Sequence, residues 1–109
     1  MTGPTVERLR ALCGTPRDGA LLRFALGNAL LETGEPEAAA TELQRATGFD
    51  PDYAAAWKLL GRALLAARNT EQARAAWTDG IAAAERSGDV QAQKEMRVFL
   101  KRLQAGGDH

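Results

Sequence analysis

An internal repeat of 34 residues constrains this chain more than any other feature of its sequence. Residues 20–53 align with residues 54–87 without a gap, and the matches concentrate in one block, Leu-Gly-x-Ala-Leu-Leu, which begins at Leu26 and again at Leu60. The small residues of the block allow paired helices to approach closely, and the leucines fill the layer between them. Since a single unit of this kind cannot bury its apolar face alone, we expect the two units to stack on each other.

The composition favours helices as the building blocks of these units. The chain has 22 Ala and 14 Leu, whereas Val and Ile together number four. Such a sequence forms helices readily and sheets poorly. With 45% hydrophobic residues in 109 positions, it should bury one core and is not disordered by composition. We therefore predict a single all-α domain over residues 1–109, a helix–turn–helix repeat solenoid of five or six antiparallel helices.

Prolines and glycines predict where the helices begin and end. Pro suits the first helical turn, where its missing N–H has no intrahelical partner, and Gly suits the left-handed position that follows a helix. Gly34 and Gly48 are predicted to end helices in this way, and Ser87-Gly88-Asp89 to end one helix and begin the next. The predicted helix starts are Thr15-Pro16, Glu35-Pro36, Asp50-Pro51 and Asn69, the last with Gln72 as its reciprocal capping partner. The predicted helices span residues 5–13, 16–33, 36–47, 51–67, 70–86 and 90–104.

The last of these segments has a clear amphipathic pattern. Its apolar residues recur at steps of three and four, which places them on one helical face, while three cations occupy the opposite face. Because the connection to the preceding helix is short, we expect the segment to pack antiparallel against that helix. The apolar face comprises Ala92, Met96, Phe99, Leu100 and Leu103, and the basic stripe comprises Lys94, Arg97 and Lys101.

The two units resemble the tetratricopeptide repeat family, whose helix–turn–helix unit has the same period. The family pattern has Trp, Leu-Gly, Tyr, Ala, Phe, Ala and Pro at set spacings. The second unit matches it at Trp57, Leu60, Gly61, Leu64, Ala73 and Trp77, and the first at Leu26, Gly27, Leu30, Ala39, Leu43, Ala46 and Pro51. The departures are Arg23 in place of Trp, Arg68 in place of the turn Gly, Gly80 in place of Ala, and Glu85 in place of the closing Pro.

The resemblance also implies a layout for the whole chain. Residues 20–53 and 54–87 are the two full repeats, residues 5–19 are an N-terminal half-repeat or cap, and residues 88–105 are a C-terminal capping helix. Arrays of this type need a polar outer face at each end. In this layout Trp57 and Trp77 are core residues.

The residue inventory argues against catalysis and against a bound cofactor or metal. His109, in the C-terminal tail, is the only histidine and Ser87 the only serine, so a Ser-His-Asp site has no credible parts. Cys13 is a single cysteine, which we interpret as a small apolar residue near a helix end. The formal net charge of zero argues against nucleic-acid binding. Neither a secretory signal nor a membrane-spanning apolar run is evident, so we expect a cytoplasmic protein without membrane insertion.

Members of the resembled family hold a peptide or a partner helix on the inner face formed by the first helix of each unit. By position, the resemblance implies that this face comprises Leu21, Phe24, Asn28 and Leu31 in the first unit and Ala55, Lys58, Arg62 and Leu65 in the second. One side of the groove would be apolar and the other basic. We expect an adaptor that binds a protein or peptide, with an apolar anchor and an acidic or carboxylate group. The carboxylate clamp of some family members fits poorly, because Phe24 stands where it needs Lys.

Several alternatives remain open at this point. Lys58 and Arg62 could be ordinary solvated charges, and Leu21 and Phe24 could be covered by the helix over residues 5–13. The apolar inner face could instead be a homodimer interface, or it could be covered by another subunit of a larger assembly. Charge is also uneven along the chain, since residues 32–52 hold six acids and one base while residues 90–104 hold four bases and one acid. Such asymmetry could steer a charged partner or self-association, or could simply decorate two different surfaces.

Overall fold

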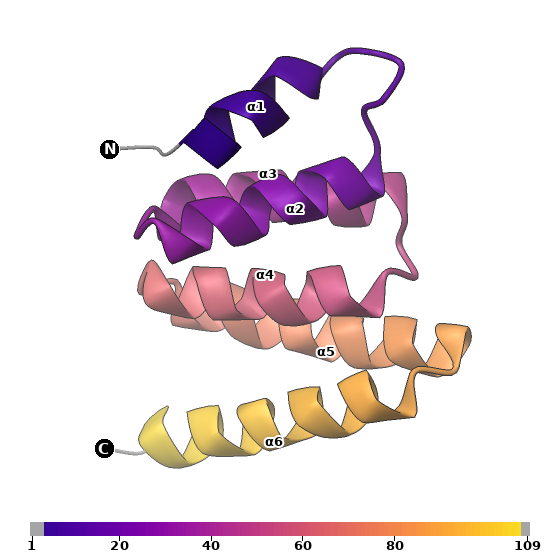
Figure 1. Cartoon of the computed structure of the whole chain (residues 1–109). Coiled ribbons are helices and arrows are strands. Elements are labelled where there is room, and N and C mark those ends of the chain that lie inside the picture. The colour runs from indigo at the N-terminus through magenta and orange to yellow at the C-terminus, as the bar shows by residue number, and fades with distance from the viewer. Residues whose placement is uncertain (1–3, 108–109) are drawn as a thin grey trace.

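The computed structural model describes residues 4–107, which form six helices and no strand. Figure 1 shows these helices stacked in chain order from one end of the molecule to the other. The helices are α1 (Pro4–Leu12), α2 (Ala20–Glu32), α3 (Pro36–Phe49), α4 (Ala54–Ala66), α5 (Thr70–Ser87) and α6 (Val90–Gly107). The predicted all-α solenoid of antiparallel helices is therefore confirmed. The tail residues Asp108 and His109, like residues 1–3, lie outside the described part of the chain.

The helices pack as consecutive hairpins. α2 packs against α3 and α4 against α5, while α3 joins the first hairpin to the second. α6 packs against both α5 and α4, and α1 packs against α2. In Figure 1, α2, α4 and α6 lie one below another on the viewer's side, with α3 and α5 behind them. The structure is elongated along the stacking direction, with extents of 41 × 31 × 18 Å, as expected when each unit contacts only its neighbours.

The repeated glycine permits the closest contact inside each hairpin. A Cβ on Gly27 would lie 2.5 Å from Cγ of Leu43, and a Cβ on Gly61 would overlap the indole ring of Trp77. The two contacts are the same contact one repeat apart, because both partners are shifted by 34 positions. A third contact of this kind explains why Gly80 replaces the family's Ala: a Cβ there would lie 2.5 Å from Sδ of Met96.

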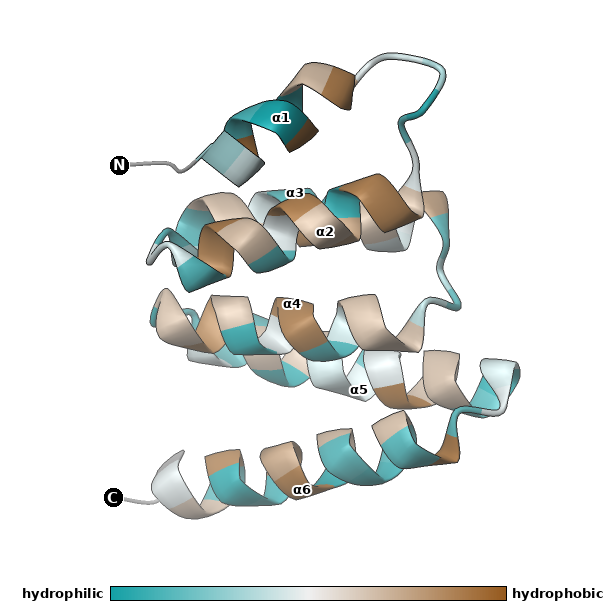
Figure 2. Ribbon diagram, viewed as in Figure 1, coloured by the Kyte–Doolittle hydropathy of each residue, from teal (hydrophilic) through white to brown (hydrophobic). Residues whose placement is uncertain are grey.

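Two buried clusters form the core. The larger runs through α1 to α5 and includes Leu26, Leu30 and Leu43, and the smaller joins α4, α5 and α6 around Trp77 and Met96. Trp57 packs against both clusters, so the predicted core role of the two tryptophans is confirmed. In Figure 2 the ribbon of α2 is mostly brown, whereas α6 alternates between teal and brown. This difference follows from position, since α2 has α1, α3 and α4 around it while α6 ends the stack.

The amphipathic pattern of α6 has the packing role that its sequence predicts. Ala92 and Met96 are buried against α4 and α5, and Phe99, Leu100 and Leu103 pack around them. Lys94, Arg97 and Lys101 are exposed. α6 therefore covers the apolar end of the second hairpin and turns a charged surface outward.

The predicted start of the second helix at residue 16 is wrong. α2 begins at Ala20, because residues 15–18 form a turn in which the amide of Asp18 donates to the carbonyl of Thr15 at 3.0 Å. The Asp18 side chain does not cap a helix that starts at Pro16. It instead accepts a hydrogen bond from the Gly14 amide at 2.9 Å and is held by Arg23.

Two other predicted helix ends and one predicted cap are also wrong. α4 begins at Ala54 and not at residue 51, because the Asp52 amide donates to the Asp50 side chain and residues 50–53 form a turn. Gly48 is an ordinary helical residue, since α3 continues to Phe49. Asn69 precedes α5 as predicted, but its side chain makes no capping hydrogen bond.

The remaining turn predictions are confirmed. Gly34 and Gly88 adopt φ angles of +80° and +73°, which end α2 and α5 in the left-handed region. Arg68 has a φ of +66° at the turn position that Gly34 holds one repeat earlier. The Asp89 carboxylate accepts a hydrogen bond from the Ala92 amide at 3.0 Å, so Ser87-Gly88-Asp89 ends one helix and begins the next.

Candidate functional site

The first helices of successive units lie side by side and form one continuous surface. α4 contacts α2 on one side and α6 on the other, and we call this surface the α2–α4–α6 face (Figure 1). The residues predicted for partner binding all lie on α2 or α4. The third helix of the face, α6, is predicted from the sequence only as a capping helix.

The α2 part of the face is less open than the sequence suggests. Leu21 is 73% exposed, so α1 does not cover it. Phe24 and Leu31, in contrast, are half-buried and pack against the core. The Phe24 ring also stacks on Tyr53, with ring centroids 5.1 Å apart. The predicted apolar run therefore contributes one exposed side chain, and not a continuous apolar surface.

Two polar groups border this part of the face. Asn28 is exposed, and its Nδ2 donates to Oε1 of Glu32 one turn later at 3.1 Å. Tyr53 lies beneath Phe24, and burial together with the charge of Asp50 raises the pKa of its hydroxyl. Asn28 is thus the accessible polar side chain among the four predicted α2 residues.

Lys58 is not the free cation that the sequence suggests. Its Nζ lies 3.3 Å from Oε2 of Glu95, so an ion pair joins α4 to α6. Glu95 is the single acid in the otherwise basic segment 90–104, and that isolation is the signal in the sequence that could have indicated a specific partner. Ala55, one turn before Lys58, is half-buried.

A pocket of about 480 Å³ opens between α4 and α6, one turn beyond the Lys58–Glu95 pair. Arg62 and Leu65 of the predicted face contribute to it from α4. Its other principal walls are Trp77 from α5 and Phe99, Arg102 and Leu103 from α6. Of the eight residues predicted for the inner face, the structure brings these two together in a pocket.

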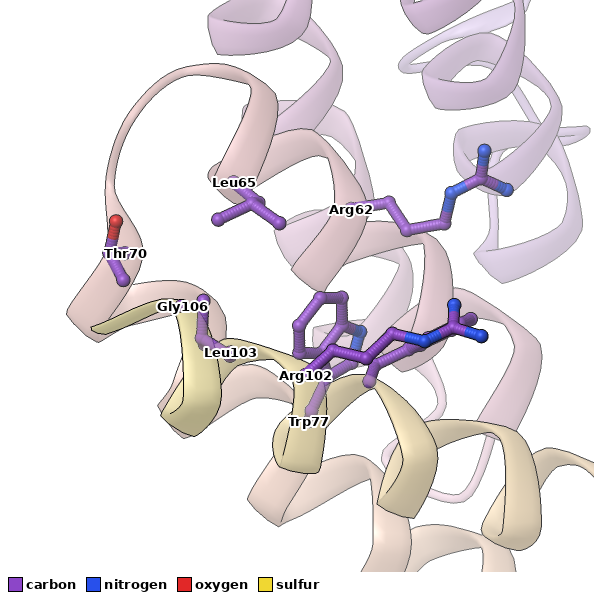
Figure 3. Close-up of a pocket in the computed structure, with 8 residues that line it drawn as sticks. Arg62, Leu65, Thr70, Trp77, Arg102, Leu103 and Gly106 are labelled. Atoms are coloured by element: carbon purple, nitrogen blue, oxygen red, sulfur yellow. The ribbon is translucent and has the colours of Figure 1, made fainter. Parts of the chain in front are cut away.

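The pocket has a basic end and an apolar end. In Figure 3 the side chains of Arg62 and Arg102 extend toward the same side, while Leu65, Thr70 and Gly106 lie toward the other. α4 and α6 run in the same direction (Figure 1). Because Arg62 precedes Leu65 in α4 and Arg102 precedes Gly106 in α6, both arginines lie at the same end of the pocket. None of the ion pairs formed within residues 4–107 includes Arg62 or Arg102.

The α6 contribution to this pocket was not foreseen. Phe99 and Leu103 were predicted only as packing residues, and Arg102 lies outside the predicted basic stripe. The helical pattern of residues 90–104 gave the apolar face of α6 correctly. It could not give the position of α6 beside α4, which depends on how the last helix docks.

A second charged cluster lies at the other end of the molecule and is internal to the fold. Arg23 pairs with Asp18 and with Glu42, each at 2.7 Å, and Arg45 also pairs with Glu42 at 2.9 Å. Hydrogen bonds from Arg23 and from the Gly14 amide hold the pKa of Asp18 well below its ordinary value. The hydrogen bonds that Arg23 donates to Asp18 and to Glu42 raise the pKa of Arg23 in turn. Arg23, which stands where the family has Trp, thus links α2 to α3 and to the preceding turn through these ion pairs.

The side chains of Cys13 and Ser87 each lie against a backbone carbonyl of the preceding helical turn. Cys13 is half-buried, with its Sγ 3.6 Å from the Leu9 carbonyl, and Ser87 donates to the Ala83 carbonyl at 2.9 Å. Within residues 4–107, no three His, Cys, Asp or Glu side chains gather as a metal site would require. Over the same range, no helix combines the length and the apolar character that a bilayer crossing needs.

Comparisons with known proteins agree with this architecture. The pattern of the tetratricopeptide repeat family matches residues 24–91. A protein of Pseudomonas aeruginosa described as containing tetratricopeptide repeats is 49% identical over 98 residues, which is 90% of this chain and 93% of the relative.

Solved structures give the same result. The solution structure of a protein from Bordetella parapertussis has a TM-score of 0.79 and 42% identity, covering 97% of this chain and 91% of its own. A tetratricopeptide repeat domain protein from Salinibacter ruber has a TM-score of 0.74 at 22% identity, covering 83% and 90%, and supports the fold alone. The 34-residue period, the glycine contacts within the hairpins and these matches together establish that the chain belongs to the tetratricopeptide repeat family.

Proposed function

We propose that this protein is an adaptor that binds a segment of another protein on the α2–α4–α6 face. The family fold supports a protein–protein interaction module in general. The observation that carries the choice of this face is the pocket between α4 and α6, which combines an apolar floor with two arginines that join no ion pair among residues 4–107. Leu65, whose exposed fraction is 40%, lines the same pocket.

The proposed role is non-catalytic. Repeat scaffolds of this kind provide an extended surface along the stack, and their binding residues are side chains that the stacking leaves open. On this face those side chains are Leu21, Asn28, Arg62 and Leu65, together with Arg102. An extended segment or a partner helix lying across α2, α4 and α6 would contact all of them.

Site-specific photo-crosslinking tests the proposal. A photoreactive amino acid replaces Asn28 or Leu65 on the proposed face, and Gln44 on α3 serves as the control, because it is exposed on a helix outside that face. We expect Asn28 and Leu65 variants to form crosslinks to the same heterologous protein in cells, and the Gln44 variant to form none to it. Equal crosslinking from Gln44, or no heterologous crosslink from either site on the face, would contradict the proposal.

A second candidate function is self-association through the N-terminal end of α2, where Leu21 lies. It is favoured by the exposure of Leu21, which stands out from Phe24 and Leu31 on the same helix. Burial of such a side chain at a two-fold interface would be favourable. In that case the crosslinks from Asn28 would join two copies of this chain.

A further inference from the structure

We propose that the pocket between α4 and α6 binds a large apolar side chain of a partner peptide whose adjacent acidic side chains pair with Arg62 and Arg102. This inference rests on the proposed function and adds the chemistry of the segment that is bound. The occupant to which it commits is an internal acidic–aromatic segment, and not a free C-terminal carboxylate.

The apolar part of the pocket is suited to an aromatic anchor. Its volume of about 480 Å³ lies within the range of about 300 to 1,000 Å³ that is typical of ligand pockets. Trp77 forms its floor, and Phe99 packs against Trp77 with ring centroids 5.1 Å apart. The one polar atom of Trp77, Nε1, donates to the Lys58 carbonyl at 3.0 Å, so the floor offers no free hydrogen-bond donor.

The charges along the contact between α4 and α6 point to an acidic ligand. Lys58 and Glu95 neutralise each other at 3.3 Å. One turn further along α4, and two turns further along α6, Arg62 and Arg102 border the same pocket and pair with no carboxylate among residues 4–107. Two like charges beside one apolar pocket leave a place for carboxylates, which guanidinium groups bind with charge-assisted hydrogen bonds.

The arrangement of the pocket limits the spacing of the two groups in the ligand. Arg62 precedes Leu65 by three residues of α4, which is about 4.5 Å along the helix axis. An extended peptide advances about 3.3 Å per residue, so the acidic residue should be next to the anchor or one position beyond it. Since the two arginines extend from different helices toward the same end of the pocket (Figure 3), two acidic side chains beside the anchor fit better than one terminal carboxylate.

NMR titrations with synthetic peptides test the inference. The probe is Asp-Glu-Phe-Glu-Asp, acetylated and amidated at its ends, compared with the capped isosteric amide Asn-Gln-Phe-Gln-Asn, with capped Asp-Glu-Ala-Glu-Asp, and with Asn-Gln-Phe carrying a free carboxylate. We expect the acidic Phe peptide to shift the backbone signals of Leu65, Phe99 and Leu103. It should bind several-fold more tightly than each of the other three.

Charge-removing variants supply the second part of the test. Arg62→Gln and Arg102→Gln should each weaken binding of the acidic Phe peptide about two- to fivefold, as expected for solvent-exposed ion pairs. Lys94→Gln is the matched control, because it removes one charge from an exposed position of α6 outside the pocket. It should leave the affinity unchanged, and the helical circular dichroism of all three variants should equal that of the parent.

The inference would be overturned by equal binding of any of the three comparison peptides, or by unchanged affinity in both arginine variants. It would also be overturned if the acidic Phe peptide produced no saturable shift at millimolar concentrations. Any of these with intact crosslinking at Asn28 and Leu65 would leave the proposed function standing with a different ligand. Absence of a heterologous crosslink from both photoreactive variants would remove the proposed function itself.

Discussion

The indole of Trp77 occupies the space where a Cβ on residue 61 would lie, so Gly61 and Trp77 set how closely α4 and α5 approach. The same ring donates a hydrogen bond to the Lys58 carbonyl and forms the floor of the pocket beside α6. A single contact therefore serves the hairpin, the capping helix and the candidate site. The equivalent contact one repeat earlier, between Gly27 and Leu43, lies inside the larger core cluster and lines neither the pocket nor the capping helix.

The first prediction concerns that contact. Gly61→Ala should lower the free energy of unfolding by about 2 to 3 kcal/mol, because the added methyl group must displace a rigid ring in a packed core. Gly48→Ala is the matched control, since Gly48 is helical and a Cβ there meets nothing within 4 Å. It should be neutral or stabilise by up to about 1 kcal/mol, because Ala favours a helix over Gly. Urea unfolding followed by circular dichroism measures both, and equal destabilisation would refute this account of the glycine.

The second prediction concerns the docking of α6. Met96 is fully buried between α5 and α4, and Met96→Ala should cost about 2 to 4 kcal/mol of stability through the cavity that it leaves. Val98→Ala on the same helix, where Val98 is 44% exposed, should change stability by no more than about 0.5 kcal/mol. Thermal unfolding compares the two. Equal effects would show that α6 is not held by its apolar face.

The third prediction concerns acid stability. Hydrogen bonds from Arg23, with a further one from the Gly14 amide, keep the pKa of Asp18 well below its ordinary value of 3.8. Because the folded-state pKa is lower than the unfolded one, this carboxylate stabilises the fold fully above about pH 4, and the contribution is lost as the pH falls further. Asp18→Asn should therefore flatten the fall of the unfolding free energy between about pH 4 and 2.

The acid prediction has an internal control. Asp79→Asn changes an exposed aspartate on α5 that joins none of the ion pairs among residues 4–107. Denaturant unfolding at a series of pH values compares the two variants with the parent. The same slope in the parent and in Asp18→Asn would show that the turn before α2 does not depend on this charge.

The fourth prediction separates the two candidate functions. Self-association through the end of α2 requires a sedimentation coefficient that rises with concentration, and Leu21→Asp should abolish that rise because it places a charge in an apolar interface. Val98→Asp, which places the same charge at an exposed apolar residue of α6, should leave any such rise intact. A concentration-independent monomer in the parent would exclude self-association and leave the adaptor proposal.

The helix ends show how far local sequence reasoning extends. Gly34, Gly88 and Pro36 mark helix boundaries correctly, because the left-handed φ of the two glycines and the fixed φ of Pro36 in the first turn are local properties. Pro16 and Pro51 mark only the turns before their helices. There the side chains of Asp18 and Asp50 bond to backbone amides of their own turns, an alternative that composition cannot rank against helix formation.

In the candidate site, too, local sequence predicts some features and tertiary contacts decide the others. Family position selects Arg62 and Leu65 correctly as members of one face, because residues on one side of a helix are fixed by its period. The pairing of Lys58 with Glu95 and the burial of Phe24 against Tyr53 are contacts between residues distant in sequence. Neither is encoded in any single helical pattern.

By itself the sequence determined the 34-residue unit, the helical class, the two glycines that allow close helix contact, and the apolar side of α6. Each of these depends on short-range periodicity and side-chain size. Only the tertiary structure decided which charges remain free and where the pocket lies. Both outcomes depend on the docking of α6 against α4 and α5, which pairs Lys58 with Glu95 and leaves Arg62 and Arg102 beside the same apolar floor. That docking is set by the shapes of two packed surfaces, and it brings together residues that lie more than thirty positions apart in the chain.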